Sequence, residues 1–131
     1  MWIISKDFTF EAAHKLPDHQ GKCSRLHGHS FKLTVYVASD RLISSGSSAG
    51  MVEDFGDISK VVKPLIEEKL DHYYLNESTG IENPTSEKLA KWIYEQLIGR
   101  VPDLYAIELA ETCTCRCLYA PGGGDFLLNS R

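Results

Sequence analysis

Two segments near the N-terminus alternate hydrophobic and polar positions with the period of a β-strand. Within residues 2–13, Phe8 and Phe10 alternate with acidic and hydroxyl side chains, and the odd positions of 27–37 are two histidines followed by four apolar side chains. This period is typical of half-buried strands. A polar turn region at 15–26 separates the two segments and indicates an antiparallel hairpin. After a serine- and glycine-rich loop, residues 51–55 are expected to rejoin the sheet.

Two segments in the middle of the chain have a helical period instead. The first is expected to begin at an Asp57 N-cap, and Pro64 inside it predicts a kink or a late start. The second is expected to be capped by Thr85 and to end at Gly99. Each carries an apolar stripe that would face a core: Ile58, Val61, Val62, Leu65, Ile66 and Leu70 in the first, and Leu89, Trp92, Ile93 and Leu97 in the second.

The last regular element is predicted as one strand from about Tyr105 to Tyr119. Its odd positions are apolar side chains or cysteines, with Glu111 as the one discordant member. The order of two strands, two helices and a strand predicts an α+β fold, in which an antiparallel sheet carries two helices packed on one face. Residues 1–131 form a single domain in this interpretation.

Composition narrows the class of protein without identifying it. The 131 residues are 43% hydrophobic and 24% charged, with a net charge of -4, as in ordinary globular proteins. No apolar stretch approaches the ~20 residues of a membrane span, and the N-terminus lacks the pattern of a signal peptide. We therefore expect a cytoplasmic protein that contacts no membrane. Mild acidity also argues against binding nucleic acid, and the small size favours a homo-oligomer if the chain is an enzyme.

Three histidines are the strongest chemical signal. His27 and His29 flank Gly28 and project from one face of a strand, and the hairpin can bring His14 opposite them. Three neutral imidazoles would bind Zn²⁺ and leave one coordination position open, as in catalytic zinc sites. Polar residues near a turn that meet nothing are the alternative, but the combination of three favours the metal. No role is expected for His19.

Cys23 and the Asp71-His72 pair each allow two interpretations. Cys23 lies four residues before His27, so it could be a fourth zinc ligand of a structural site or a reactive thiol beside the metal. The spacing does not decide between them. Asp71 could orient the imidazole of His72 for proton transfer, although adjacent side chains usually point apart. Taken alone, the pair favours capping of a helix end.

Glu111 interrupts the apolar face of the last predicted strand. A buried carboxylate needs hydrogen-bond donors, and the edge of a pterin or guanine ring, with two N–H groups, would suit it. An exposed strand end is the alternative. The cysteines on the same face, Cys113, Cys115 and Cys117, are interpreted as small core residues, because one strand face gives no tetrahedral metal site.

Five segments closely resemble, in order, the motifs of the 6-pyruvoyltetrahydropterin synthase family: F-T-F-E-A-A-H-K-L at 8–16, C-S-R-L-H-G-H at 23–29, L-D-H-Y-Y-L-N at 70–76, E-N-P-T-S-E at 82–87 and E-T-C-T-C-R-C-L-Y at 111–119. The resemblance implies the T-fold, in which sheets from several subunits join into a barrel and active sites lie at subunit interfaces. It is greatest to the bacterial branch that makes a 6-carboxy product for queuosine biosynthesis.

The resemblance also implies a role for each matching residue. His14, His27 and His29 correspond to the zinc ligands, Cys23 to the catalytic base, Asp71 and His72 to its relay partners, Glu111 to the catalytic carboxylate that anchors the pterin ring, and Thr85 and Ser86 to the lining of the pterin pocket. No role is implied for Cys115, Cys117 or the tail at 121–131.

The implied reaction is a zinc-dependent lyase reaction. It converts 7,8-dihydroneopterin triphosphate to 6-carboxy-5,6,7,8-tetrahydropterin, acetaldehyde and triphosphate. The same residues would serve a synthase that eliminates triphosphate without carbon–carbon cleavage and leaves a 6-pyruvoyl product. A non-enzymatic zinc-binding module, closed by Cys23, is the alternative of a different class. Glu111 and the Asp71-His72 pair argue against that module, because a structural zinc site would not need them.

Overall fold

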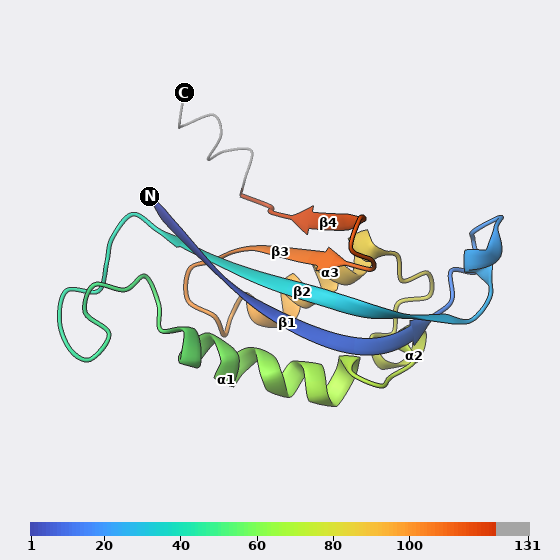
Figure 1. Ribbon diagram of the computed structural model, residues 1–131, viewed down its shortest axis with the longest axis horizontal. Helices are drawn as coiled ribbons and strands as arrows, with labels where there is room; N and C mark the ends of the chain where they lie inside the picture. Colours follow the sequence, from blue (N-terminus) through green and yellow to red (C-terminus); the bar gives the residue numbers. More distant parts are fainter. Residues whose placement is uncertain (123–131) are drawn as a thin grey trace, which may run out of the picture.

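A computed structural model describes residues 1–122, which form one antiparallel sheet with helices on one side. The sheet has the order β1-β2-β3-β4, with β1 at Trp2–His14, β2 at His27–Ser39, β3 at Leu104–Ala110 and β4 at Arg116–Tyr119. β1 and β2 form the long hairpin that runs along the molecule in Figure 1. The strands predicted at 2–13 and 27–37 are therefore confirmed.

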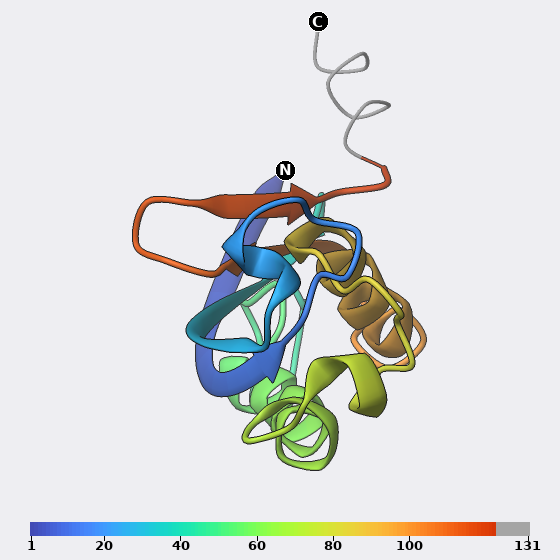
Figure 2. The same cartoon turned by 90° about the vertical axis from the view of Figure 1, so that its right-hand side faces the viewer.

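The helices lie between the two halves of the sheet in sequence. They are α1 at Phe55–Leu65, the π-helical turn η2 at Ile66–Leu70, the short α2 at Leu75–Ser78 and α3 at Ser86–Leu97, while the loop between β1 and β2 holds the 3₁₀ turn η1 at Lys22–Ser24. Seen along the hairpin in Figure 2, the sheet curves around α1 and α3. The predicted α+β fold, with two main helices on one face, is confirmed. Among residues 1–122, no helix combines the length and apolarity needed to cross a bilayer.

The helix ends follow the sequence only in part. Thr85 is the N-cap of α3, because its hydroxyl accepts a hydrogen bond from the Lys88 N–H at 3.2 Å. The N-cap of α1 is Asp54, whose carboxylate accepts from the Gly56 N–H at 2.7 Å, so the prediction of Asp57 was wrong. The expected return to the sheet at 51–55 was also wrong, since this cap leads directly into α1. Pro64 lies inside the last turn of α1, and the chain continues directly from α1 into the wider π-helical turn η2.

The core lies between the sheet and the helices. Phe10 and Phe31 stack at a ring distance of 5.0 Å on the inner face of the hairpin. Further buried side chains from the sheet and both helices complete this core, among them Leu33, Val35, Ile107 and Leu109 from strands and Ile58, Val62, Leu89, Ile93 and Leu97 from helices. The opposite face of the sheet is polar: Asp7 accepts a hydrogen bond from Thr34 at 2.8 Å. The apolar stripes predicted for both helices are thus confirmed as the buried side.

The strand predicted at 105–119 is two strands joined by a turn. β3 ends at Ala110, the chain turns at 111–115, and β4 returns antiparallel to β3. The prediction that all three later cysteines are core residues was wrong, because Cys113 and Cys115 are exposed in the turn and Cys117 is half-buried. Threonine and cysteine continued the strand alternation through a turn that contains no glycine or proline, so the sequence carried no sign of the break.

Residues 71–74 cover the free edge of β1 beside its C-terminal end. The His72 N–H donates to the Glu11 carbonyl, and the Ala13 N–H donates to the Tyr73 carbonyl at 3.1 Å. His72 adopts a left-handed backbone with φ of 64°, which bends the chain onto the strand. The segment therefore acts as a short extra edge that holds the end of β1 in place.

Candidate metal centre and its surroundings

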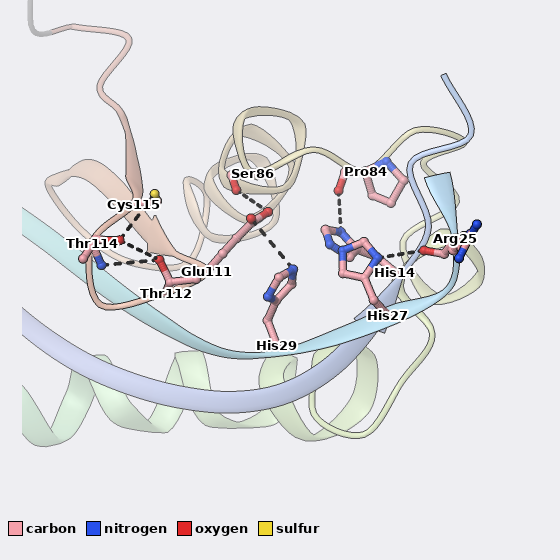
Figure 3. A network of polar contacts seen from close by, with 10 residues as sticks. All are labelled: His14, Arg25, His27, His29, Pro84, Ser86, Glu111, Thr112, Thr114 and Cys115. Atoms are coloured by element: carbon pink, nitrogen blue, oxygen red, sulfur yellow. Dashed lines mark hydrogen bonds and ion pairs between the residues drawn. The ribbon is translucent and has the colours of Figure 1, made fainter. Parts of the chain in front are cut away.

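The three predicted histidines meet at one end of the hairpin. His14 ends β1 and faces His27 in the register of the sheet, and His29 follows two residues along β2. One ring nitrogen from each lies within 4.8 Å of the others. Figure 3 shows the rings turned toward one another. Three convergent imidazoles of this kind could hold a metal ion.

Backbone carbonyls fix the orientation of two of these rings. His14 Nδ1 lies 2.9 Å from the Pro84 carbonyl oxygen, and His27 Nδ1 lies 2.7 Å from the Arg25 carbonyl oxygen. A carbonyl only accepts, so each Nδ1 carries the proton and each Nε2 keeps its lone pair. Both Nε2 atoms are buried, and neither has a hydrogen-bond partner within residues 1–122. Metal-binding histidines typically have this arrangement, since a bound ion satisfies the lone pair.

The surroundings keep two of these histidines neutral. His14 is fully buried, and burial lowers its pKa despite the opposing effects of the Pro84 carbonyl and Glu111. Burial likewise lowers the pKa of His29, again against the effect of Glu111. Desolvation penalises the charged imidazolium. Both rings are therefore in the neutral form that coordinates metals at neutral pH.

Glu111 and Ser86 lie together beside the histidines. The Ser86 hydroxyl at the start of α3 donates to Glu111 Oε1 at 2.6 Å, and Glu111 Oε2 lies 3.9 Å from His29 Nε2 (Figure 3). Glu111 follows the end of β3 instead of continuing a strand, and its side chain remains about a quarter exposed. The structure thus brings two of the residues predicted for ligand binding next to the histidines, with Thr85 adjacent as the cap of α3.

Asp71 and His72 contact each other although they are neighbours in sequence. Asp71 Oδ2 lies 3.0 Å from His72 Nδ1, and Asp71 Oδ1 accepts the Glu11 N–H at 2.9 Å. The Glu11 N–H, followed by His72, lowers the pKa of Asp71. The carboxylate therefore stays ionised and orients the imidazole, whose side chain is 78% exposed. His72 lines an open groove of about 480 Å³ with Glu11, Gly28 and Ser30.

Cys23 is linked to neither of these groups by a polar contact in the described residues. It belongs to η1 in the loop before β2 and is half-buried. Its sulfur is not among the ligand atoms that converge with the three histidines, which disfavours the interpretation of Cys23 as a fourth ligand. Within residues 1–122, no hydrogen bond or ion pair joins Cys23 to Asp71 or His72.

Several residues that shape this site carry no signal in the sequence. Pro84 and Arg25 orient histidines through backbone carbonyls, and any residue type can supply a carbonyl. The Glu11 N–H binds the Asp71 carboxylate, and the Glu11 carbonyl accepts from the His72 N–H. The Glu11 carboxylate accepts from the Ser30 hydroxyl at 2.6 Å. Only the resemblance of segments 8–16, 23–29 and 82–87 to family motifs could have drawn attention to these positions.

A family model and related proteins identify the group to which the chain belongs. The model described as 6-pyruvoyl tetrahydropterin synthase matches residues 3–121. The chain belongs to the 6-pyruvoyl tetrahydropterin synthase family. This family member is 57% identical, over 91% of its length and 93% of the relative's, to a Synechocystis sp. protein named 6-carboxy-5,6,7,8-tetrahydropterin synthase. A Haemophilus influenzae protein of the same name is 34% identical, over 91% of this chain and 99% of the relative.

Solved structures agree on the fold of this family member. The 6-pyruvoyl tetrahydropterin synthase of Caenorhabditis elegans superposes with a TM-score of 0.78 at 23% identity, covering 91% of this chain and 94% of the other. The Plasmodium falciparum enzyme of that name gives a TM-score of 0.62 at 19% identity, covering 90% and 96%. The predicted family and the T-fold of its subunit, an antiparallel sheet with helices on one face, are confirmed, while the barrel formed by several subunits stays a prediction.

Proposed function

We propose that this chain is a zinc-dependent 6-carboxy-5,6,7,8-tetrahydropterin synthase. It would convert 7,8-dihydroneopterin triphosphate and water to 6-carboxy-5,6,7,8-tetrahydropterin, acetaldehyde and triphosphate, in queuosine biosynthesis. The observation that carries the proposal is the cluster of three histidines beside the Glu111–Ser86 pair, in a chain 57% identical to a protein of that name. The four cysteines are unpaired, in keeping with action in the reducing cytoplasm.

Zinc is the metal that best fits the cluster. The donors are three neutral imidazoles, a set common in catalytic zinc sites, and two of their lone pairs are buried without a partner in the described residues. Bound there, zinc would supply Lewis acidity that stabilises negative charge on the side-chain oxygens of the substrate. Because Cys23 stays outside the ligand set, an open coordination position would remain for those oxygens.

Glu111 would hold the pterin ring. Its carboxylate can accept two parallel hydrogen bonds from the N–H groups along the ring edge. The Ser86 hydroxyl fixes one carboxylate oxygen, so the other is presented in a defined direction near His29. Thr85 would line the same pocket next to Ser86. A pterin ring bound in this way would direct the side chain of the substrate toward the three histidines.

Proton transfer would fall to Cys23, Asp71 and His72. As a thiolate, Cys23 would take a proton from the substrate side chain, which allows triphosphate to leave by elimination. Asp71 keeps the proton of His72 on Nδ1, so Nε2 is free to pass a proton on. Cleavage of a carbon–carbon bond then releases acetaldehyde.

The active site would be completed by a second copy of the chain. No hydrogen bond or ion pair joins Cys23 to His72 within residues 1–122, and His72 is largely exposed and lines an open groove. A neighbouring subunit that docks on this groove would bring its own Cys23 to His72. A homo-oligomer with active sites at subunit interfaces is therefore part of the proposal.

Product analysis tests the proposed reaction. The zinc-loaded protein is incubated with 7,8-dihydroneopterin triphosphate, and we expect acetaldehyde together with the 6-carboxy product. A 6-pyruvoyl product without acetaldehyde would reject the carboxy reaction and support the alternative synthase.

A Cys23→Ala variant tests the role of the thiol in the same assay. We expect turnover to fall by about 10²- to 10⁴-fold, the usual contribution of a positioned proton-transfer group, while bound zinc stays at the wild-type level. Loss of zinc and of folding in this variant would instead support a structural zinc module.

A further inference from the structure

We propose that the side-chain amide of Asn76 is a positioning group for the metal ligand His14. Asn76 lies in α2, outside the metal cluster, and no hydrogen bond joins it to any of the three histidines in the described chain. Its hydrogen-bond partners are backbone groups of Lys15 and Glu82. The proposal rests on the proposed function only in taking zinc as the metal.

The amide first holds Lys15, the residue that follows His14 directly after the end of β1. Asn76 Oδ1 accepts the Lys15 N–H at 3.0 Å, and Asn76 Nδ2 donates to the Lys15 carbonyl at 2.8 Å. Both backbone groups of Lys15 are thus paired with one side chain. Residues 72 and 73 pair with β1 through their own backbone, but the chain then turns into α2 at Leu75. The Asn76 side chain continues the edge at the point where the backbone has left it.

The same amide also holds the loop that orients the His14 ring. Asn76 Nδ2 donates a second hydrogen bond to the Glu82 carbonyl at 3.1 Å. Two residues further on, the Pro84 carbonyl accepts from His14 Nδ1 at 2.9 Å. One side chain therefore links the strand that carries His14 to the loop that fixes its ring. A shift of either segment would move the buried Nε2 away from the other two ligand atoms.

The chemistry of these contacts calls for an amide of this length. One acceptor meets an N–H and two donor hydrogens meet two carbonyls, which also fixes which amide atom is oxygen and which is nitrogen. An aspartate at this position would keep the first contact but would direct a carboxylate oxygen at two carbonyl oxygens. A leucine would have the same number of side-chain heavy atoms, branched at the same carbon, and none of the contacts. These substitutions therefore separate the hydrogen bonds from the space that the side chain fills.

Zinc affinity measured without substrate tests the proposal. In the full-length protein, Asn76→Asp is expected to raise the zinc dissociation constant about tenfold, the lower end of what loss of an outer-layer contact costs a metal site. Asn76→Leu is expected to act in the same direction. Competition with a chromophoric chelator gives the constant, and the visible spectrum of the Co²⁺ form reports the geometry of the ligands.

Thr79→Val is the matched control. Thr79 follows α2, and its hydroxyl donates to the Leu75 carbonyl and accepts from the Ile81 N–H at 3.2 Å, but within residues 1–122 no hydrogen bond joins its side chain to β1. We expect this variant to lower the melting temperature of the metal-free protein at least as much as Asn76→Asp does, with zinc affinity and the Co²⁺ spectrum unchanged. Asn76→Ala leaves room for water at the three backbone partners and serves the same comparison if the other variants fold poorly.

Wild-type zinc affinity and Co²⁺ spectrum in the Asn76 variants, together with a lower melting temperature of the metal-free form, would overturn the proposal and leave Asn76 a merely structural residue. These readouts need no turnover. A wild-type protein that binds zinc but forms no 6-carboxy product would reject the proposed function alone, whereas unchanged zinc affinity in the Asn76 variants of an active enzyme would reject the positioning role alone.

Discussion

The two ends of the β1–β2 hairpin differ in what they bury and what they expose. At one end, His14 is fully buried, and its Nε2 has no partner among the described residues. At the other end, Trp2 and Phe55 are each 49% exposed, and they line an open apolar hollow of about 360 Å³ with Ile3 and Met51. One end buries polar atoms and the other exposes apolar side chains, which is the reverse of what maximum stability would favour.

The difference shows where the fold gives up stability for function. A buried polar atom without a partner costs free energy of about 1–3 kcal/mol, so the histidine end is arranged for a bound ion and not for the metal-free chain. Backbone carbonyls, the edge formed by residues 71–74 and the Asn76 side chain hold that arrangement. Among residues 1–122, the opposite end has no buried polar atom without a partner. Its exposed apolar side chains lose only the free energy that their burial would contribute.

Removal of a histidine ligand is expected to have the largest effect. His14→Ala deletes one of three ligand atoms, so zinc affinity should fall by more than about 100-fold, beyond the range typical of outer-layer changes. Zinc content after dialysis and chelator competition measure this loss. A variant that still holds one zinc per chain at wild-type affinity would show that His14 is not a ligand.

Ser86→Ala is expected to have an intermediate effect at the same end. It removes a 2.6 Å hydrogen bond to the Glu111 carboxylate, and a hydrogen bond to a charged group contributes roughly 2 kcal/mol. We expect the substrate KM to rise by roughly tenfold or more, with zinc content unchanged, in steady-state kinetics. Ser47→Ala, in the exposed loop before α1, is the control that should leave KM unchanged; an equal KM for both variants would remove Glu111 and Ser86 from the pterin pocket.

Phe55→Ser is expected to have the smallest effect, since it lies at the opposite end. The side chain is half exposed at the start of α1, so the free energy of unfolding should change by no more than about 0.5 kcal/mol, as measured by urea denaturation. Zinc affinity should stay at the wild-type value. A loss of more than about 1.5 kcal/mol, or a change in oligomeric state, would mean that another copy of the chain covers this end.

The comparison also shows how far sequence patterns reach. Strand alternation correctly placed His27 and His29 on one face and His14 opposite them, because a hairpin of two long strands has a fixed register. The same reasoning failed at 111–115, where alternation continued through a turn. Because alternation continued through this turn, it predicted a buried face for Cys113 and Cys115, and that prediction was wrong. Glu111 nevertheless reached the site, since it is the residue at which β3 ends.

The sequence by itself determined the family, through five motif segments that resemble it. It also determined the α+β fold and the three-histidine cluster, because these two depend on local period and on the pairing of neighbouring strands. Only the tertiary structure decided how the cluster is held. The Pro84 carbonyl lies 70 residues from His14 in sequence, and Asn76 reaches Lys15 across 61 residues. Such contacts join backbone groups that every residue type possesses, so no pattern in the sequence marks them, and only the folded chain brings them together.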